Sequence, residues 1–187
     1  NPNLTITTDA SYHDMYYMGW GYGEDTLANH IRKEVSVFTD SLYNARVHTE
    51  RFMTMLFTDT IGMNFKAGGD VSFMRSVFNI AGSLQGHHVF DGWSMYHYFT
   101  NAEIFELWRL RNIYWYTHWA NSPQNGNRMP FIERALLRNI VESADRAIAN
   151  GRKGADLRFG HETCLLPLAC LMELDSVNLS TDDLDNL

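Results

Sequence analysis

The sequence predicts a mainly α-helical protein with two short strands. Apolar residues recur at intervals of three and four over most of the chain, which is the period of a helix with one buried face. A Gly-Gly pair, two Asn-Gly pairs and a capping box divide these stretches into about five helices. Two short runs, residues 4–7 and 156–159, instead alternate apolar and polar side chains as a strand does.

The N-terminal part is expected to begin with the strand at 4–7, and a glycine-rich loop at 19–23 follows it. These glycines lack the spacing of a dinucleotide-binding fingerprint, so we expect a loop without a phosphate role. The first helix is predicted from about Asp25 to Tyr43. Its apolar face carries Leu27, Ile31, Val35, Phe38 and Leu42.

Two helices are predicted next. The first begins near Thr49 and buries Phe52, Met55 and Leu56. The second follows Gly68-Gly69, with Asp70 suited to its N-cap, and ends between Gly82 and Gly86. The apolar residues of the second are Phe73, Met74, Val77, Phe78 and Ala81.

Thr100-Asn-Ala-Glu103 has the pattern of a capping box, in which the Thr and Glu side chains each satisfy a backbone N–H group of the other residue. The helix that it opens is rich in aromatic residues. Such a helix either presents rings for stacking on sugars or bases, or is buried on most sides, and we expect the second. Its apolar residues are Ile104, Phe105, Leu107, Trp108, Leu110, Ile113, Tyr114, Trp115, Tyr116 and Trp119.

The C-terminal third contains a turn cluster at 121–126 and then a helix expected from Pro130 to Asn150-Gly151. The strand at 156–159 and an apolar helix after His161-Glu162 follow it. Two isolated strands do not make a stable sheet. We therefore expect either a part of a larger fold that contains a sheet, or an all-α unit with irregular ends.

The composition excludes some partners. The chain of 187 residues has a formal net charge of -7, whereas nucleic-acid surfaces need clustered Lys and Arg. No apolar run is long enough to span a membrane, and no signal peptide is visible. Cys164 and Cys170 would be about 9 Å apart along a continuous helix, beyond the reach of a disulfide, so we expect two small buried side chains.

His161 and Glu162 are the residues with the clearest potential for chemistry. A helix N-terminus offers unpaired N–H groups and the positive end of the helix dipole, both of which favour phosphate. His161 can hold an anion when protonated, and Glu162 can protonate a leaving group. The alternative is structural, because Glu favours the first turn of any helix. A zinc-protease motif is excluded, since it needs a His where Leu165 stands.

His87-His88 beside Asp91 is a second cluster of possible ligands. Adjacent side chains point in different directions, and no Cys or further His has the spacing to complete a metal site. We expect solvated or capping histidines there, and we expect no metal ion or cofactor in this chain.

Arg158-Phe-Gly-His-Glu-Thr-Cys-Leu-Leu-Pro-Leu168 resembles the C-terminal active-site segment of the histidine acid phosphatases, in particular the bacterial branch similar to multiple inositol polyphosphate phosphatases. In that family a His followed by an acidic residue ends a core strand. The resemblance covers nearly the whole chain. Its other segments are Asp9–Met18, Phe90-Asp91, Tyr98–Thr100, Leu107-Trp108, Asn112 and Ser122–Gly126.

One departure from the family limits what the resemblance implies. The family's nucleophile lies in an N-terminal Arg-His-Gly-x-Arg-x-Pro motif, but none of the eight His residues here follows an Arg. The resemblance therefore implies the C-terminal half of such an enzyme, with the helical cap domain of a histidine-phosphatase α/β fold. Within this single unit, residues 1–8 would form a strand into the core, 9–150 the helical domain, and 151–187 the return to the core.

The resemblance also implies an activity for the intact parent, that of an acid phosphatase or phytase acting on phosphomonoesters such as inositol polyphosphates. A nucleophilic His from the N-terminal half of the same enzyme would form a phosphohistidine. Glu162 would protonate the leaving alcohol and then help to activate water, while His161 would stabilise charge on the phosphoryl oxygens. This chain alone would be inactive, and the resemblance places the parent in the periplasm or at the cell surface.

The helical domain is expected to form one wall of the substrate cleft. Four basic residues are candidates to bind distal phosphates, and their spacing does not select among them. They are Arg46, Arg51, Lys66 and Arg75. The second hypothesis is a non-catalytic helical binding or interaction domain, in which His161-Glu162 is only a helix cap.

Overall fold

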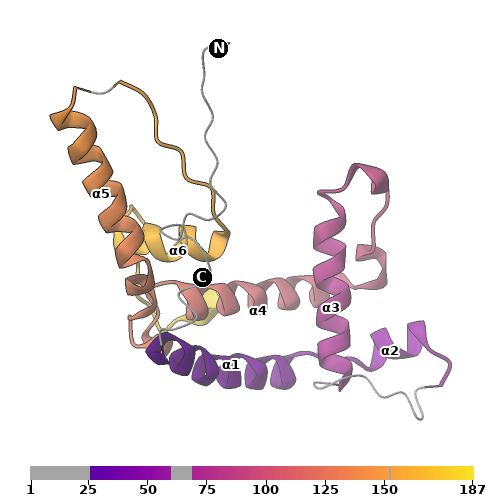
Figure 1. Ribbon diagram of the computed structural model, residues 1–187. Coiled ribbons are helices and arrows are strands. Elements are labelled where there is room, and N and C mark those ends of the chain that lie inside the picture. The colour runs from indigo at the N-terminus through magenta and orange to yellow at the C-terminus, as the bar shows by residue number, and fades with distance from the viewer. Residues whose placement is uncertain (1–25, 60–68, 152) are drawn as a thin grey trace. The chain divides into compact units, whose positions relative to one another are not determined.

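The computed structural model describes residues 26–59, 69–151 and 153–187. These residues form six α-helices and no strand, so the predicted mainly helical class is confirmed (Figure 1). The expected strand at 4–7, the glycine-rich loop at 19–23 and Lys66 lie outside the described residues. The α-helices are α1 (Thr26–Arg46), α2 (Glu50–Leu56), α3 (Gly69–Leu84), α4 (Asn101–Trp119), α5 (Arg134–Ala149) and α6 (Glu162–Leu171).

The chain forms two compact units. The first unit comprises residues up to 33 together with 117–182, and the second comprises 34–116 together with 183–187. The chain passes from one unit to the other within α1 and within α4. Both α5 and α6 belong to the first unit.

The second unit has an apolar core to which α1, α2, α3 and α4 all contribute. Phe52, from α2, lies at its centre and stacks on Phe99 with 5.0 Å between the ring centroids. The buried core residues are Tyr43, Val47, Phe52, Met53, Met74, Val77, Phe78, Phe99, Leu107, Leu110 and Ile113. Most were predicted from their spacing, but Met55 was predicted buried and is 43% exposed.

The capping box of α4 is confirmed. The backbone N–H of Thr100 donates to Glu103 Oε2 at 2.7 Å, and the backbone N–H of Glu103 donates to Thr100 Oγ1 at 3.2 Å. The expected burial of α4 on most sides is only partly right, because Phe105 and Trp108 are 56% and 48% exposed. Asp70 lies in the first turn of α3 rather than at its N-cap, because the helix already begins at Gly69.

In the first unit, a buried asparagine joins the end of α4 to the following turn. The Asn125 side-chain amide donates to the carbonyl oxygens of Thr117 and Ala120 at 2.8 and 2.9 Å. The helix expected from Pro130 starts as the 3-10 helix η5 (Met129–Glu133) and continues as α5 from residue 134. Gly151, with a φ of 57°, follows α5 as the sequence predicted.

The predicted strand at 156–159 is wrong. Residues 153–161 form an irregular connection between α5 and α6 (Figure 1). Leu157 and Phe159 are 75% and 82% exposed, while Arg158 between them is half-buried against α5. A strand needs a neighbouring strand for its backbone hydrogen bonds, and no described residue supplies one.

Candidate functional site

His161 and Glu162 lie side by side at the N-terminal end of α6. His161 is the N-cap residue, with extended backbone angles of φ -88° and ψ 163°, and Glu162 is the first helical residue. The His161 carbonyl accepts the N–H groups of Cys164 and Leu165 at 3.0 and 3.2 Å. The His161 side chain makes no capping bond, and both side chains are exposed, so both remain accessible to a ligand.

The orientation of α6 follows from its buried face. Thr163, Cys164, Pro167 and Cys170 are buried, at spacings that place them along one side of the helix. This side packs against η5, so residues 161 and 162 stay at the surface. Neither Cys164 nor Cys170 forms a disulfide with a described residue, and the prediction of two small buried side chains is confirmed. Pro167 lies inside the helix, where its missing N–H removes the bond to the Thr163 carbonyl.

A buried carboxyl group lies behind the first turn of α6. Glu133, the last residue of η5, is 0% exposed, and among the described residues no nitrogen or oxygen donor reaches either of its carboxyl oxygens. Burial raises the pKa of Glu133 to about 7, although the neighbouring Cys164 thiol acts in the opposite direction. Burial, together with Glu133, raises the pKa of Cys164 to about 11. Cys164 is therefore a neutral thiol at physiological pH.

Arg158 fixes the connection that leads into the His161-Glu162 pair. Its Nη2 donates to Asn139 Oδ1 at 2.8 Å and to Ser143 Oγ at 2.7 Å, both on α5. Its Nε also donates to Asn139 Oδ1, at 3.2 Å. The Arg158 side chain thus attaches the irregular segment to α5, and Leu157 and Phe159 on either side of it face solvent.

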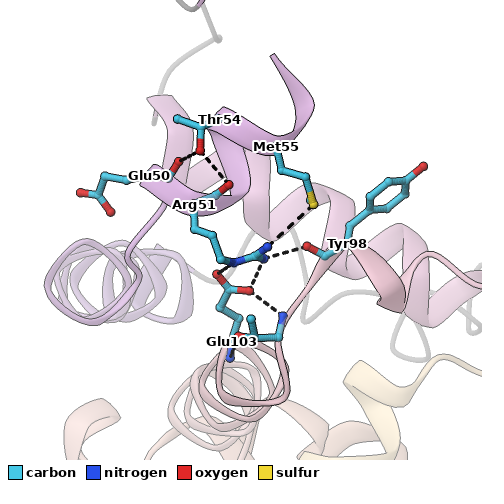
Figure 2. A network of polar contacts seen from close by, with 7 residues as sticks. Glu50, Arg51, Thr54, Met55, Tyr98 and Glu103 are labelled. Atoms are coloured by element: carbon cyan, nitrogen blue, oxygen red, sulfur yellow. Dashed lines mark hydrogen bonds and ion pairs between the residues drawn. The ribbon is translucent and has the colours of Figure 1, made fainter. Parts of the chain in front are cut away.

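The candidate phosphate-binding residues Arg46 and Arg51 line a cavity of about 380 Å³ in the second unit. Each has carboxylate partners. Arg51 binds Glu103 through two nitrogens and also donates to the Tyr98 carbonyl at 2.8 Å (Figure 2). Arg46 pairs with Asp185 at 2.8 Å and with Glu106 at 3.6 Å. Both arginines therefore stabilise the unit, and their charge is largely compensated.

Arg75 lies in a different cavity of the same unit. Its guanidinium carbon lies over the ring of Tyr43, 4.2 Å from the centroid, and 5.4 Å from the centroid of Tyr114. Its ion pair is with Asp40, whose side chain is 65% exposed, at a long 3.4 Å. Of the three described candidates, Arg75 is the one whose positive charge is least compensated by a carboxylate. His161 and Glu162 belong to the other unit.

Two further residues, Glu133 and Arg111, lie at positions in the structure that the sequence did not predict. Arg111 lines the same cavity as Arg75 and donates to the Asn79 side-chain oxygen. It lies between apolar positions of an aromatic helix, a pattern that predicts solvent exposure, and Arg111 is exposed while it also lines the cavity. Glu133 lies at a helix start, where a charged side chain usually faces water. Neither residue could be identified from its local sequence, because burial and pocket formation depend on segments that are distant in the chain.

The comparisons with known proteins give no family for this chain. Its sequence matches neither a protein-family model nor a curated protein. Among the described residues, no cluster of three His, Cys, Asp or Glu side chains could hold a metal ion. None of the helices that the structure describes is long and apolar enough to cross a bilayer.

Proposed function

We propose that this chain is the C-terminal part of a histidine acid phosphatase that hydrolyses phosphomonoesters, with inositol polyphosphates as the first substrates to test. The sequence resemblance around His161-Glu162 motivates the proposal. In the structure, both side chains are accessible at the N-terminal end of a helix, where backbone N–H groups and the helix dipole favour a phosphoryl group.

The observation that supports the proposal most is the surface beside the pair. Leu157 and Phe159 lead directly to His161 and are largely exposed, whereas the polar Arg158 is turned toward the protein. Large exposed apolar side chains next to a pair of functional residues are typical of a surface that another segment covers. We propose that the segment carrying the nucleophilic His packs there and completes the site.

The reaction then has two steps. The nucleophilic His attacks phosphorus, the bond to the ester oxygen breaks, and Glu162 gives its proton to the departing alcohol. In the second step Glu162 accepts a proton from water as the water attacks the phosphohistidine, so that phosphate leaves and the enzyme is restored. His161, when protonated, donates a hydrogen bond to a phosphoryl oxygen in both steps.

The test measures phosphate release from phytate by the protein that joins this chain to its native upstream segment. The Glu162→Gln variant should bind phytate but release phosphate at least about a hundredfold more slowly, because a general acid contributes that much to the rate. Glu142→Gln, on the exposed side of α5, is the matched control and should keep full activity. Unchanged turnover by Glu162→Gln would refute the assignment.

The alternative, a helical binding domain without hydrolytic activity, is favoured by one observation. Phe105 and Trp108 are adjacent on α4, their rings stack with 5.9 Å between centroids, and both are about half exposed. Exposed aromatic pairs are common in binding surfaces. Phytate binding without phosphate release by the joined protein would support this alternative over the phosphatase.

A further inference from the structure

A small cavity in the second unit lies where α1, α3 and α4 meet. Its volume is about 190 Å³. The side chains that line it are Tyr43 from α1, Arg75 and Asn79 from α3, and Arg111, Tyr114 and Trp115 from α4. All six side chains can donate hydrogen bonds, through two guanidinium groups, two phenol hydroxyls, a side-chain amide and an indole N–H. The cavity is therefore rich in donors and poor in acceptors.

The charges of this cavity are not balanced within the described residues. Arg75 and Arg111 contribute two positive charges, and among the residues that the structure describes Asp40 is the single carboxylate that pairs with either of them. Asp40 contacts Arg75 at 3.4 Å and its side chain is mostly exposed, so water screens this pair. Arg111 is held by the neutral Asn79 side chain. A local excess of positive charge in a chain of net charge -7 indicates a site for an anion.

The two tyrosines orient Arg75. The guanidinium carbon lies over the rings of Tyr43 and Tyr114, 4.2 and 5.4 Å from their centroids, so cation–π contacts with both rings hold the Arg75 side chain at the cavity wall. Burial raises the pKa of Tyr43, although the nearby Arg75 and Arg111 act to lower it. The hydroxyl therefore stays protonated at neutral pH and can donate a hydrogen bond.

We propose that this cavity binds the phosphate group of a small phosphorylated molecule, with Arg75 and Arg111 as the charged ligands and Tyr43 as a neutral donor. Guanidinium groups match the geometry of phosphate oxygens and form strong charge-assisted hydrogen bonds with them. A cavity of this volume accommodates one phosphate group rather than a whole polyphosphorylated ring. The site goes beyond the proposed hydrolysis and does not depend on it, because none of its residues takes part in the reaction.

The experiment is isothermal titration calorimetry of the full chain with inorganic phosphate and, separately, with glycerol 2-phosphate, at constant ionic strength in chloride. We expect saturable binding of both. Arg75→Gln and Arg111→Gln should each weaken binding by about tenfold, since each removes a charge-assisted hydrogen bond. Asp40→Asn should tighten binding by about threefold, because it removes the competing carboxylate. Tighter binding of the ester identifies a phosphorylated metabolite as the ligand, and tighter binding of phosphate identifies the free ion.

Two controls make this result specific. Arg138→Gln, on the exposed side of α5, removes the same charge elsewhere and should leave the affinity unchanged. Arg111→Lys keeps the charge without the planar donor group and should recover part of the loss, so a folding defect in Arg111→Gln does not decide the outcome. Absence of saturable binding, or an equal loss in Arg138→Gln and Arg111→Gln, would overturn the proposal.

Discussion

The carboxylate of Glu103 binds Arg51 and caps its own helix at the same time. Its Oε1 accepts Arg51 Nε at 2.9 Å, and its Oε2 accepts both Arg51 Nη2 and the Thr100 backbone N–H (Figure 2). Partial burial raises the pKa of Glu103, but the hydrogen bonds from Arg51 and Thr100 outweigh burial and lower it overall. Arg51 thus joins α2 to the start of α4, and its N–H groups bind protein groups rather than being available to a ligand.

Replacing Arg51 should therefore affect stability slightly and phosphate binding not at all. Arg51→Gln is expected to lower the free energy of unfolding by less than ~1 kcal/mol, because the Arg51 side chain is 44% exposed and the pair is screened. Urea denaturation measures the stability, and calorimetry with inorganic phosphate measures the affinity. A tenfold loss of affinity would show that Arg51, and not only Arg75 and Arg111, contacts the ligand.

The capping box predicts a second effect on stability. Thr100→Ala should destabilise the second unit by about 1 kcal/mol, because the Glu103 backbone N–H loses the hydroxyl oxygen that accepts its hydrogen bond. Thr100→Ser keeps an acceptor at this position and should remain close to the wild type. Equal unfolding midpoints for the Ala and Ser variants would mean that the hydroxyl contributes nothing measurable.

Glu133 predicts a dependence of stability on pH. Its pKa is raised from an ordinary 4.5 to about 7 in the folded protein, so between these values the folded state binds more protons than the unfolded state. The free energy of unfolding should accordingly fall as the pH rises from about 4.5 to about 7, by about 3 kcal/mol in total. Above pH 7 the contribution of Glu133 should be constant.

Glu133→Gln tests this prediction by removing the titrating group. Urea denaturation between pH 4 and pH 8 should show that the variant gains stability relative to the wild type as the pH rises through this range. Glu142→Gln, which replaces an exposed carboxylate on α5, should keep the pH profile of the wild type. A constant difference between Glu133→Gln and the wild type across the range would show that Glu133 ionises as it does in the unfolded chain.

Replacing Arg158 should change the mobility of the segment before His161. Its bonds to Asn139 and Ser143 attach the segment before His161 to α5, so Arg158→Gln should release this segment without unfolding the helices. Cleavage by chymotrypsin after Phe159 should become about tenfold faster, because the segment loses the hydrogen bonds that the charged Arg158 side chain donates. Arg138→Gln serves as the control for charge. Identical cleavage rates would indicate that another contact holds the segment.

The helices were predictable because their signals are local. The spacing of apolar residues in α1 and α3, the capping pair Thr100 and Glu103, and the glycine after α5 each depend on residues within a few positions. A local pattern gave a wrong prediction at residues 156–159. Alternation predicts a strand when a sheet is available to pair with it, and the described residues contain no such sheet.

The candidate site was predictable only in part. His161 and Glu162 were found because Gly160 and the apolar run after them mark a helix start, and the structure places them there. The spacing of the arginines could not distinguish Arg75 from Arg46 and Arg51, because the difference lies in partners distant in sequence. Asp185 and Glu103 compensate two of them, whereas Tyr43 and Tyr114 orient the third.

The most direct test of the account compares two leaving groups in the protein that joins this chain to its nucleophile segment. An alkyl phosphate needs a proton on its departing oxygen, whereas p-nitrophenolate leaves without one. Glu162→Gln should slow phosphate release from the alkyl ester by about a hundredfold or more but preserve the initial burst of p-nitrophenol from p-nitrophenyl phosphate. Loss of that burst together with the alkyl activity, or unchanged turnover of both esters, would contradict the role of Glu162 as the general acid.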